Sequence, residues 1–158
     1  MQKKSLVLLL CLTCVAAMAQ QNEQERNKQV ARSFFEVLDQ GRLDKYADSH
    51  TVDFIAHGSD HDATLAEDMA AAREERKALP DMRMRADEVL AERDLVMVRW
   101  TVSGTNTQAG MGFPATGKKI TTGGITLFRF KAGKICEEWS AWNMLSVMRQ
   151  AGLYPAPQ

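Results

Sequence analysis

The hydrophobic pattern of the chain changes its period once, close to residue 81. Before that point, apolar residues recur at the spacing of amphipathic helices, as at Phe34, Val37 and Leu38. After it, apolar and polar residues alternate with the period of two that is typical of strands, starting at Met82. The sequence therefore predicts helices first and a sheet afterwards.

The helical part divides into three segments. The first covers 22–40 and is followed by a glycine, which favours the end of a helix, and the second is a short helix over 42–48. The third begins at Thr64, which has the spacing of a capping box with Glu67, and ends before Pro80. Residues 52–56 alternate weakly and predict a short strand.

The second half reads as a run of strands joined by turns. The expected strands are 82–87, 95–102, 120–130 and 134–143, and residues 144–150 can form a last helical turn. Helices that are segregated from an antiparallel run of strands indicate an α+β layer architecture. The chain has 158 residues, which suffices for one domain.

The N-terminus has the pattern of a secretory signal peptide over residues 1–19. Two lysines precede an apolar run, and Ala17 and Ala19 have the spacing that precedes cleavage, so Gln20 would start the mature chain. The run is too short to span a bilayer. We therefore expect a domain over 22–154 that is periplasmic or secreted, with no membrane contact after cleavage.

Composition narrows the function classes. The chain has a net charge of zero and no basic stripe, which argues against nucleic acid as a partner. Of three cysteines, Cys136 alone lies outside the predicted signal peptide, which excludes a disulfide framework within the mature chain. The fold must then be stabilised by packing.

Six segments in order resemble the SnoaL-like polyketide or ester cyclase family, within the nuclear transport factor 2-like superfamily. These segments are 79–83, 98–105, 112–118, 124–130, 133–139 and 148–153. The resemblance implies a cone-shaped α+β barrel, in which a curved antiparallel sheet wraps around helices and leaves a cavity. It also implies a ring-closing aldol step on a small apolar ligand, without metal or organic cofactor. Many relatives dimerise, so the resemblance also implies a possible homodimer.

The family pattern places an acid/base aspartate four residues after the tryptophan of the last strand. That tryptophan is Trp139 here, and Asn143 stands at the aspartate position. Strand period places both on one face, so a cavity-lining Trp139 implies a cavity-lining Asn143. An amide can orient a carbonyl but cannot act as a general base. The alternative is that Trp139 packs in the core and that Asn143 contacts a backbone group.

His57 and His61 are candidates for the missing base, because histidine titrates near neutrality. Their spacing also suggests metal ligands, but Gly58 and Ser59 indicate a loop, where this spacing does not converge on a metal. We therefore predict no metal, and an ordinary surface loop stays open as the alternative.

Two further aromatic residues are predicted to bind the ligand together with Trp139. Tyr46 is expected at the cavity by analogy with the cone, and Trp100 is expected there although both faces of its strand are apolar. The function that follows is a cyclase or isomerase acting on a small apolar carbonyl compound. A non-catalytic module that binds a hydrophobic ligand, and a structural dimer with a filled cavity, are the alternatives.

Overall fold

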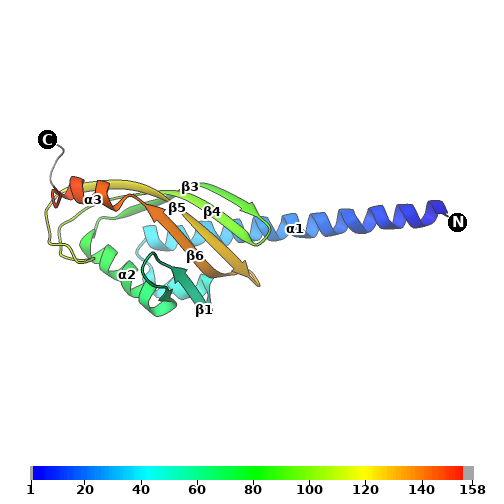
Figure 1. Cartoon of the computed structure of the whole chain (residues 1–158), viewed down its shortest axis with the longest axis horizontal. Coiled ribbons are helices and arrows are strands. Elements are labelled where there is room, and N and C mark those ends of the chain that lie inside the picture. The colour runs from blue at the N-terminus through cyan, green and yellow to red at the C-terminus, as the bar shows by residue number, and fades with distance from the viewer. Residues whose placement is uncertain (1, 155–158) are drawn as a thin grey trace.

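The structure, a computed structural model, describes residues 2–154, and the side chains from residue 18 onward. The first element is the long helix α1 (Gln2–Asp39), whose N-terminal half extends beyond the rest of the fold (Figure 1). Its C-terminal half packs inside the molecule, where Ala31, Phe34 and Phe35 are buried. Among residues 2–154, no helix has the combination of length and hydropathy that a bilayer crossing requires.

Two shorter helices follow α1 and correspond to the second and third predicted helical segments. The 3₁₀ helix η1 (Leu43–Ser49) carries the buried Tyr46. Helix α2 (Leu65–Ala78) begins with the predicted capping box, in which the Thr64 hydroxyl accepts a hydrogen bond from the Glu67 backbone and the Glu67 carboxylate accepts one from the Thr64 backbone. The cap confirms the predicted start of this helix.

Six strands form one curved, unclosed sheet in the order β2-β1-β6-β5-β4-β3. The strands are β1 (His50–His57), β2 (Ala63–Thr64), β3 (Arg83–Glu92), β4 (Leu95–Thr105), β5 (Lys119–Lys131) and β6 (Lys134–Trp142). Strands β3 to β6 are the predicted antiparallel run, whereas β1 pairs with β6 in parallel and makes the sheet mixed. Helix α3 (Met144–Ala151) follows at the end of the chain.

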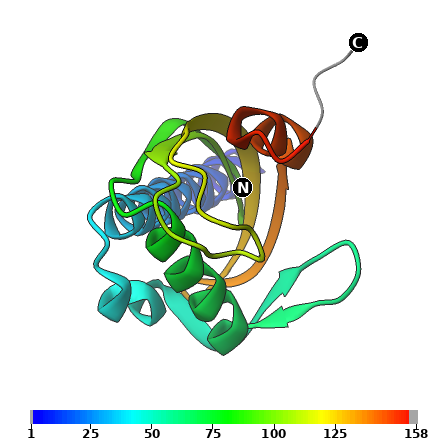
Figure 2. The ribbon, with the colours of Figure 1, turned by 90° about the vertical axis from the view of Figure 1, so that its left-hand side faces the viewer.

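The sheet curves around α1 and α2, which lie on its concave side (Figure 2). The core lies between them and is built from α1 and from alternate residues of the strands, including the fully buried Val96, Val98 and Phe128. The predicted α+β class is confirmed. A strongly curved sheet that covers helices on one side can leave an unfilled space where the helices stop short of it.

A β-bulge interrupts the strand period of β6. Ile135 pairs with Phe130 of β5. The residue before Phe130, Arg129, pairs with Glu137 and not with Cys136. Cys136 is therefore an extra residue without a partner on β5. Residues directly opposite each other on paired strands share a face of the sheet. The bulge therefore places every later side chain of β6 on the face opposite to the one that a strict period of two predicts.

Candidate functional site

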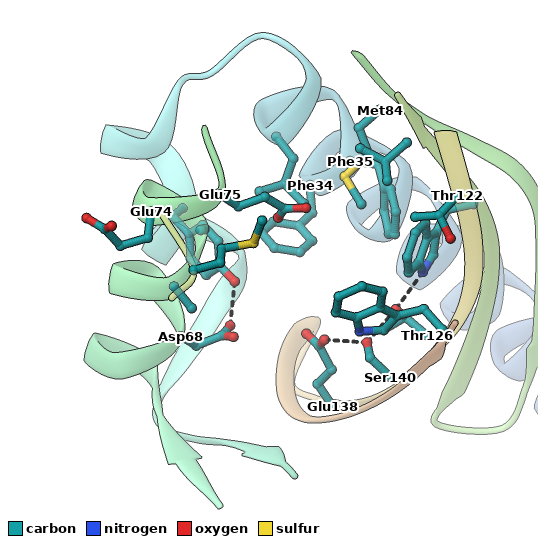
Figure 3. Close-up of a pocket in the computed structure, with 18 of the residues that line it drawn as sticks. Phe34, Phe35, Asp68, Glu74, Glu75, Met84, Thr122, Thr126, Glu138 and Ser140 are labelled. Atoms are coloured by element: carbon teal, nitrogen blue, oxygen red, sulfur yellow. Dashed lines mark hydrogen bonds between the residues drawn. The ribbon is translucent and has the colours of Figure 1, made fainter. Parts of the chain in front are cut away.

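A cavity of about 520 Å³ lies between the concave face of the sheet and the three N-terminal helices. Its walls are mostly apolar and include Phe34, Phe35 and Leu38 from α1 and Phe128 from β5. Polar groups reach it from α2 and β6 (Figure 3). A concave apolar space with a few convergent polar groups is the usual form of a small-molecule site.

A chain of hydrogen bonds crosses the sheet along one wall of the cavity. The indole of Trp100 donates to the Thr126 hydroxyl at 2.9 Å, and the Thr126 and Ser140 hydroxyl oxygens are 2.7 Å apart. The Ser140 hydroxyl donates to Oε1 of Glu138 at 2.7 Å (Figure 3). Because an indole can only donate, the chain of donors runs from Trp100 towards the Glu138 carboxylate.

Gly124 makes the room for this arrangement. A Cβ built on Gly124 would lie 2.4 Å from Cζ2 of Trp100 and 2.7 Å from the Ala141 carbonyl oxygen. The indole of Trp100 therefore lies across β5, where any larger residue at position 124 would collide with it. This close approach brings its N–H to Thr126.

Glu138 is a carboxyl of the cavity with a strongly raised pKa. Its pKa is raised from 4.5 to about 7, chiefly by burial and then by the negative charge of Asp68, while the Ser140 hydrogen bond acts in the opposite direction. The residue is half-buried, because its carboxyl faces the cavity and protein surrounds its other sides. A carboxyl that titrates near neutrality can both take up and release a proton at ordinary pH.

A second polar group lies on the helical wall. The Tyr46 hydroxyl of η1 donates a hydrogen bond to the Asp68 carboxylate of α2 (Figure 3). Burial, followed by the charges of Asp68 and Glu138, raises the Tyr46 pKa well above its usual value. Burial also raises the Asp68 pKa, which the Tyr46 hydrogen bond lowers. Tyr46 therefore stays protonated, and its single hydroxyl proton is directed to Asp68.

The arrangement is that of an acid–base site. One wall carries Glu138, a carboxyl of near-neutral pKa, and another wall carries the hydroxyl donor Tyr46 beside Asp68. The mostly apolar walls between them lower the local dielectric constant, which strengthens both interactions. Within residues 18–154, no cluster of three or more His, Cys, Asp or Glu side chains is placed to hold a metal ion.

The comparison with protein families decides the relationship of this chain. A profile of the SnoaL-like polyketide cyclase family matches residues 28–151, which include every residue of the cavity. The chain belongs to this family. A search of curated protein sequences found no match.

Solved structures of several bacterial proteins have the same fold as this SnoaL-like chain. AclR from Streptomyces galilaeus, a suggested hydroxylase, has a TM-score of 0.78 and 23% identity over 85% of this chain and 86% of its own. TsrD from Streptomyces laurentii has a TM-score of 0.75 and 21% identity over 83% and 98%. A SnoaL-like polyketide cyclase from Agrobacterium tumefaciens has a TM-score of 0.66 and 16% identity over 78% and 96%. At these identities the likeness shows the fold alone.

Two of the aromatic residues that the sequence singled out line the cavity of the SnoaL-like domain. Tyr46 reaches it from η1 and Trp100 from β4, and both are largely buried. Trp142, at the end of β6, lines it as well. The structure brings these side chains together from three elements, and their role in ligand binding stays a prediction.

Trp139 does not line this cavity. The prediction that its side of the last strand faces the cavity is wrong. Trp139 pairs with Leu127 on the outer face of the sheet, because the bulge at Cys136 reverses the alternation. Its ring stacks on the imidazole of His57, with centroids 4.6 Å apart and planes inclined by 15°. The guanidinium of Arg129 lies 5.7 Å from its centroid.

The other predicted site residues also lie away from the cavity. Asn143 accepts a hydrogen bond from the Ser146 backbone at 2.9 Å and so caps α3, which is the backbone contact that the alternative interpretation expected. His57 places Nδ1 3.1 Å from Asp62 and Nε2 3.2 Å from Glu137. His61 is exposed. None of the three lines the space that Glu138 faces.

Three polar residues of the cavity, Glu138, Ser140 and Asp68, were not predicted from the sequence. Glu138 and Ser140 alternate with Trp139, so a strict period of two placed them outside. Asp68 lies in the first turn of α2, where an acidic residue has an ordinary explanation in the helix dipole. The polar pair Glu138 and Ser140 at alternate positions of the last strand was the available signal.

Proposed function

We propose that the cavity binds a small, mostly apolar carbonyl compound and that Glu138 moves a proton on it as a general acid–base. The observation that carries this proposal is the placement of Glu138, which faces an apolar cavity while Ser140 holds its carboxylate. An amide at position 143 no longer argues against catalysis, because a different strand position supplies the titratable group.

The proposed reaction is an intramolecular ring closure, as the family resemblance suggests. The ionised Glu138 takes a proton from the carbon next to a carbonyl group, and the electron pair of that C–H bond forms an enolate. The enolate carbon attacks a second carbonyl of the same molecule, and Glu138 returns the proton to the new alkoxide. Tyr46, on the helical wall, can donate to the oxygen on which charge develops when its single O–H turns from Asp68 to that oxygen.

Binding without turnover is the second candidate. It is favoured by the walls of the cavity, which are mostly apolar. In this case Glu138 and Tyr46 would only orient the ligand. Both candidates need the same cavity and differ in whether a proton leaves the ligand.

Proton exchange in D₂O separates the two candidates. A panel of methyl-ester polyketides and simpler β-diketones would be followed by NMR for enzyme-dependent loss of the protons next to the carbonyl. We expect exchange with the natural chain and a loss of at least about 100-fold in Glu138→Gln. Glu137→Gln, the same change one residue earlier on the outer face, is the matched control and should keep the rate.

Two outcomes would speak against catalysis. Equal exchange rates in Glu138→Gln and the natural chain would remove Glu138 from the mechanism. Binding of the panel without exchange in any variant would leave the binding module as the function.

Export is part of the proposal. The pattern of residues 1–19 supports it, and the structure is compatible with cleavage after Ala19, because the side chains of 18–23 are all exposed. The reaction would then take place in the periplasm or outside the cell.

A further inference from the structure

The charged side chains around the cavity all have the same sign. Among the described lining residues the charged ones are Asp68, Glu74, Glu75 and Glu138, and there is no lysine, arginine or histidine. The chain as a whole carries as many basic as acidic residues. The bias is therefore a property of the cavity and not of the composition.

Glu75 differs from the other acids of this set in its hydrogen bonding. Its carboxyl is directed towards the cavity beside Phe34 (Figure 3), and burial raises its pKa. Within residues 18–154, no hydrogen bond or ion pair joins this carboxyl to another side chain, whereas Glu138 has Ser140 and Asp68 has Tyr46.

The neighbouring cation, Arg76, forms no ion pair with Glu75. The Arg76 guanidinium donates hydrogen bonds to the backbone carbonyl oxygens of Leu38, Asp39 and Met82. These bonds direct it to the end of α1 and to the residue before β3. It lowers the Glu75 pKa less than burial raises it. A half-buried acid that faces an apolar cavity and has open acceptor positions destabilises the fold, unless a bound group provides the partner.

The aromatic lining favours the same kind of partner. Phe34, Tyr46, Trp100 and Trp142 present rings to the cavity. The negative face of an aromatic ring attracts a cation, and the attraction is strongest where water is excluded. Rings and carboxylates together are suited to a protonated amine on an apolar skeleton, and they are unfavourable to an anion, which would meet several acids without one cation.

We propose that the ligand of this cavity carries a basic nitrogen, which binds protonated to the Glu75 carboxylate while its apolar part fills the space between the aromatic side chains. This inference rests on the proposed function in one respect, that the cavity holds a small molecule. The acids then have separate roles, because Glu75 binds the cation, Glu138 exchanges a proton, and Asp68 holds Tyr46.

Amine binding at Glu75 would depend on pH. The groups that face Glu75 are Arg76, Asp68 and Glu74 on its own helix, Glu138 from β6 and Tyr46 from η1. Without a bound cation, burial favours the protonated carboxyls, whereas a bound cation favours the ionised form. Amine binding should therefore release protons where Glu75 is protonated in the free protein and grow tighter as the pH rises through that range, which the binding of a neutral analogue should not do.

Three probes that share one skeleton and differ in charge test this inference. They are 1-naphthylmethylamine, 1-naphthylmethanol and 1-naphthoic acid, and binding is measured at pH 7.5 by calorimetry and by quenching of tryptophan fluorescence. We expect the amine to bind at least about 10-fold more tightly than the alcohol and the acid more weakly than both. Glu75→Gln should reduce the amine to the affinity of the alcohol and leave the alcohol unchanged.

Glu74→Gln is the matched control. This residue is adjacent on α2, but its carboxylate pairs with Lys77 at 3.6 Å and its side chain is half exposed. We expect Glu74→Gln to lower the preference for the amine by less than about twofold, because water screens this exposed charge. Where Glu75→Gln fails to fold, proton release by the Glu138→Gln variant, measured in two buffers of different ionisation enthalpy, shows whether a carboxyl on α2 ionises when the amine binds.

The failures of the two proposals can be told apart. An alcohol that binds as tightly as the amine, or a Glu75→Gln variant that retains the preference, overturns the basic-nitrogen inference and leaves the proposed function standing. If none of the three probes binds while a carbonyl substrate still exchanges its protons, this inference fails and the proposed function stands. If no carbonyl compound of the panel binds or exchanges, the proposed function fails and this inference fails with it.

Discussion

Ser140 donates a hydrogen bond of 2.7 Å to Glu138, two residues away on the concave face of β6. This bond stabilises the ionised carboxylate and so opposes the burial that raises its pKa to about 7. Ser140→Ala should therefore raise the Glu138 pKa further, by about one unit. The pH profile of proton exchange, or NMR of labelled glutamate, would show the shift. Ser33→Ala, at an exposed position of α1, should leave the profile unchanged.

Glu138 also lowers stability at neutral and higher pH. Its pKa is about 7 in the folded chain against an ordinary value of 4.5, so the folded state binds more protons and stability falls as the pH rises through that interval. The loss is on the order of 2 to 3 kcal/mol above pH 7. Glu138→Gln should recover it, so that urea denaturation shows a larger gain at pH 8 than at pH 5. Equal gains at both values would contradict this explanation.

His50 has the opposite effect at acid pH. Burial lowers its pKa from 6.5 to about 4, so the unfolded state binds more protons and stability falls as the pH drops from 6.5 to 4. The fall is on the order of 3 kcal/mol. His50→Phe keeps a ring among Phe34 and Phe54 and should flatten the dependence over this range. His61→Phe, in an exposed loop, should keep the dependence of the natural chain.

His57 provides a test of the histidine base that the sequence suggested. It stacks on Trp139 on the outer face of the sheet, away from Glu138, so His57→Ala should keep proton exchange within about twofold. The variant should lose roughly 1 kcal/mol of stability with the stacked pair. A large loss of exchange, at unchanged stability, would return the histidine to the mechanism.

Cleavage after Ala19 is expected to leave the domain intact. The first buried side chain of α1 among those described is Asn27, so the packed part of the helix lies beyond the cut. Intact mass and N-terminal sequencing of the exported protein should show Gln20 as the first residue. Ala19→Arg should block this cleavage. A mature protein that retains residues 1–19 would refute the signal peptide.

Much of the fold could be predicted because its signals are local. The capping box of Thr64 and Glu67 starts α2 through contacts within one turn. The turn at Ala132 and Gly133 adopts positive φ at both residues and joins β5 to β6, as the short connection between two strands predicted. The parallel pairing of β1 with β6 has no such local signal, because it depends on how the first half docks on the second.

The aromatic part of the candidate site could also be anticipated. Tyr46 and Trp100 are large residues with one polar atom, and the family resemblance provided the cone in which they would meet. Glu138 could not be anticipated in the same way. Its role depends on which face of β6 it occupies, and that face depends on the pairing with β5.

The sequence by itself determined the order of helices and strands, the caps and turns that bound them, and the family to which they belong, since these follow from neighbours along the chain. The tertiary structure alone decided that Glu138, and not Trp139 or Asn143, faces the cavity. The physical reason is the bulge at Cys136: one unpaired residue reverses the alternation of side chains, and only the partner strand reveals where that residue lies.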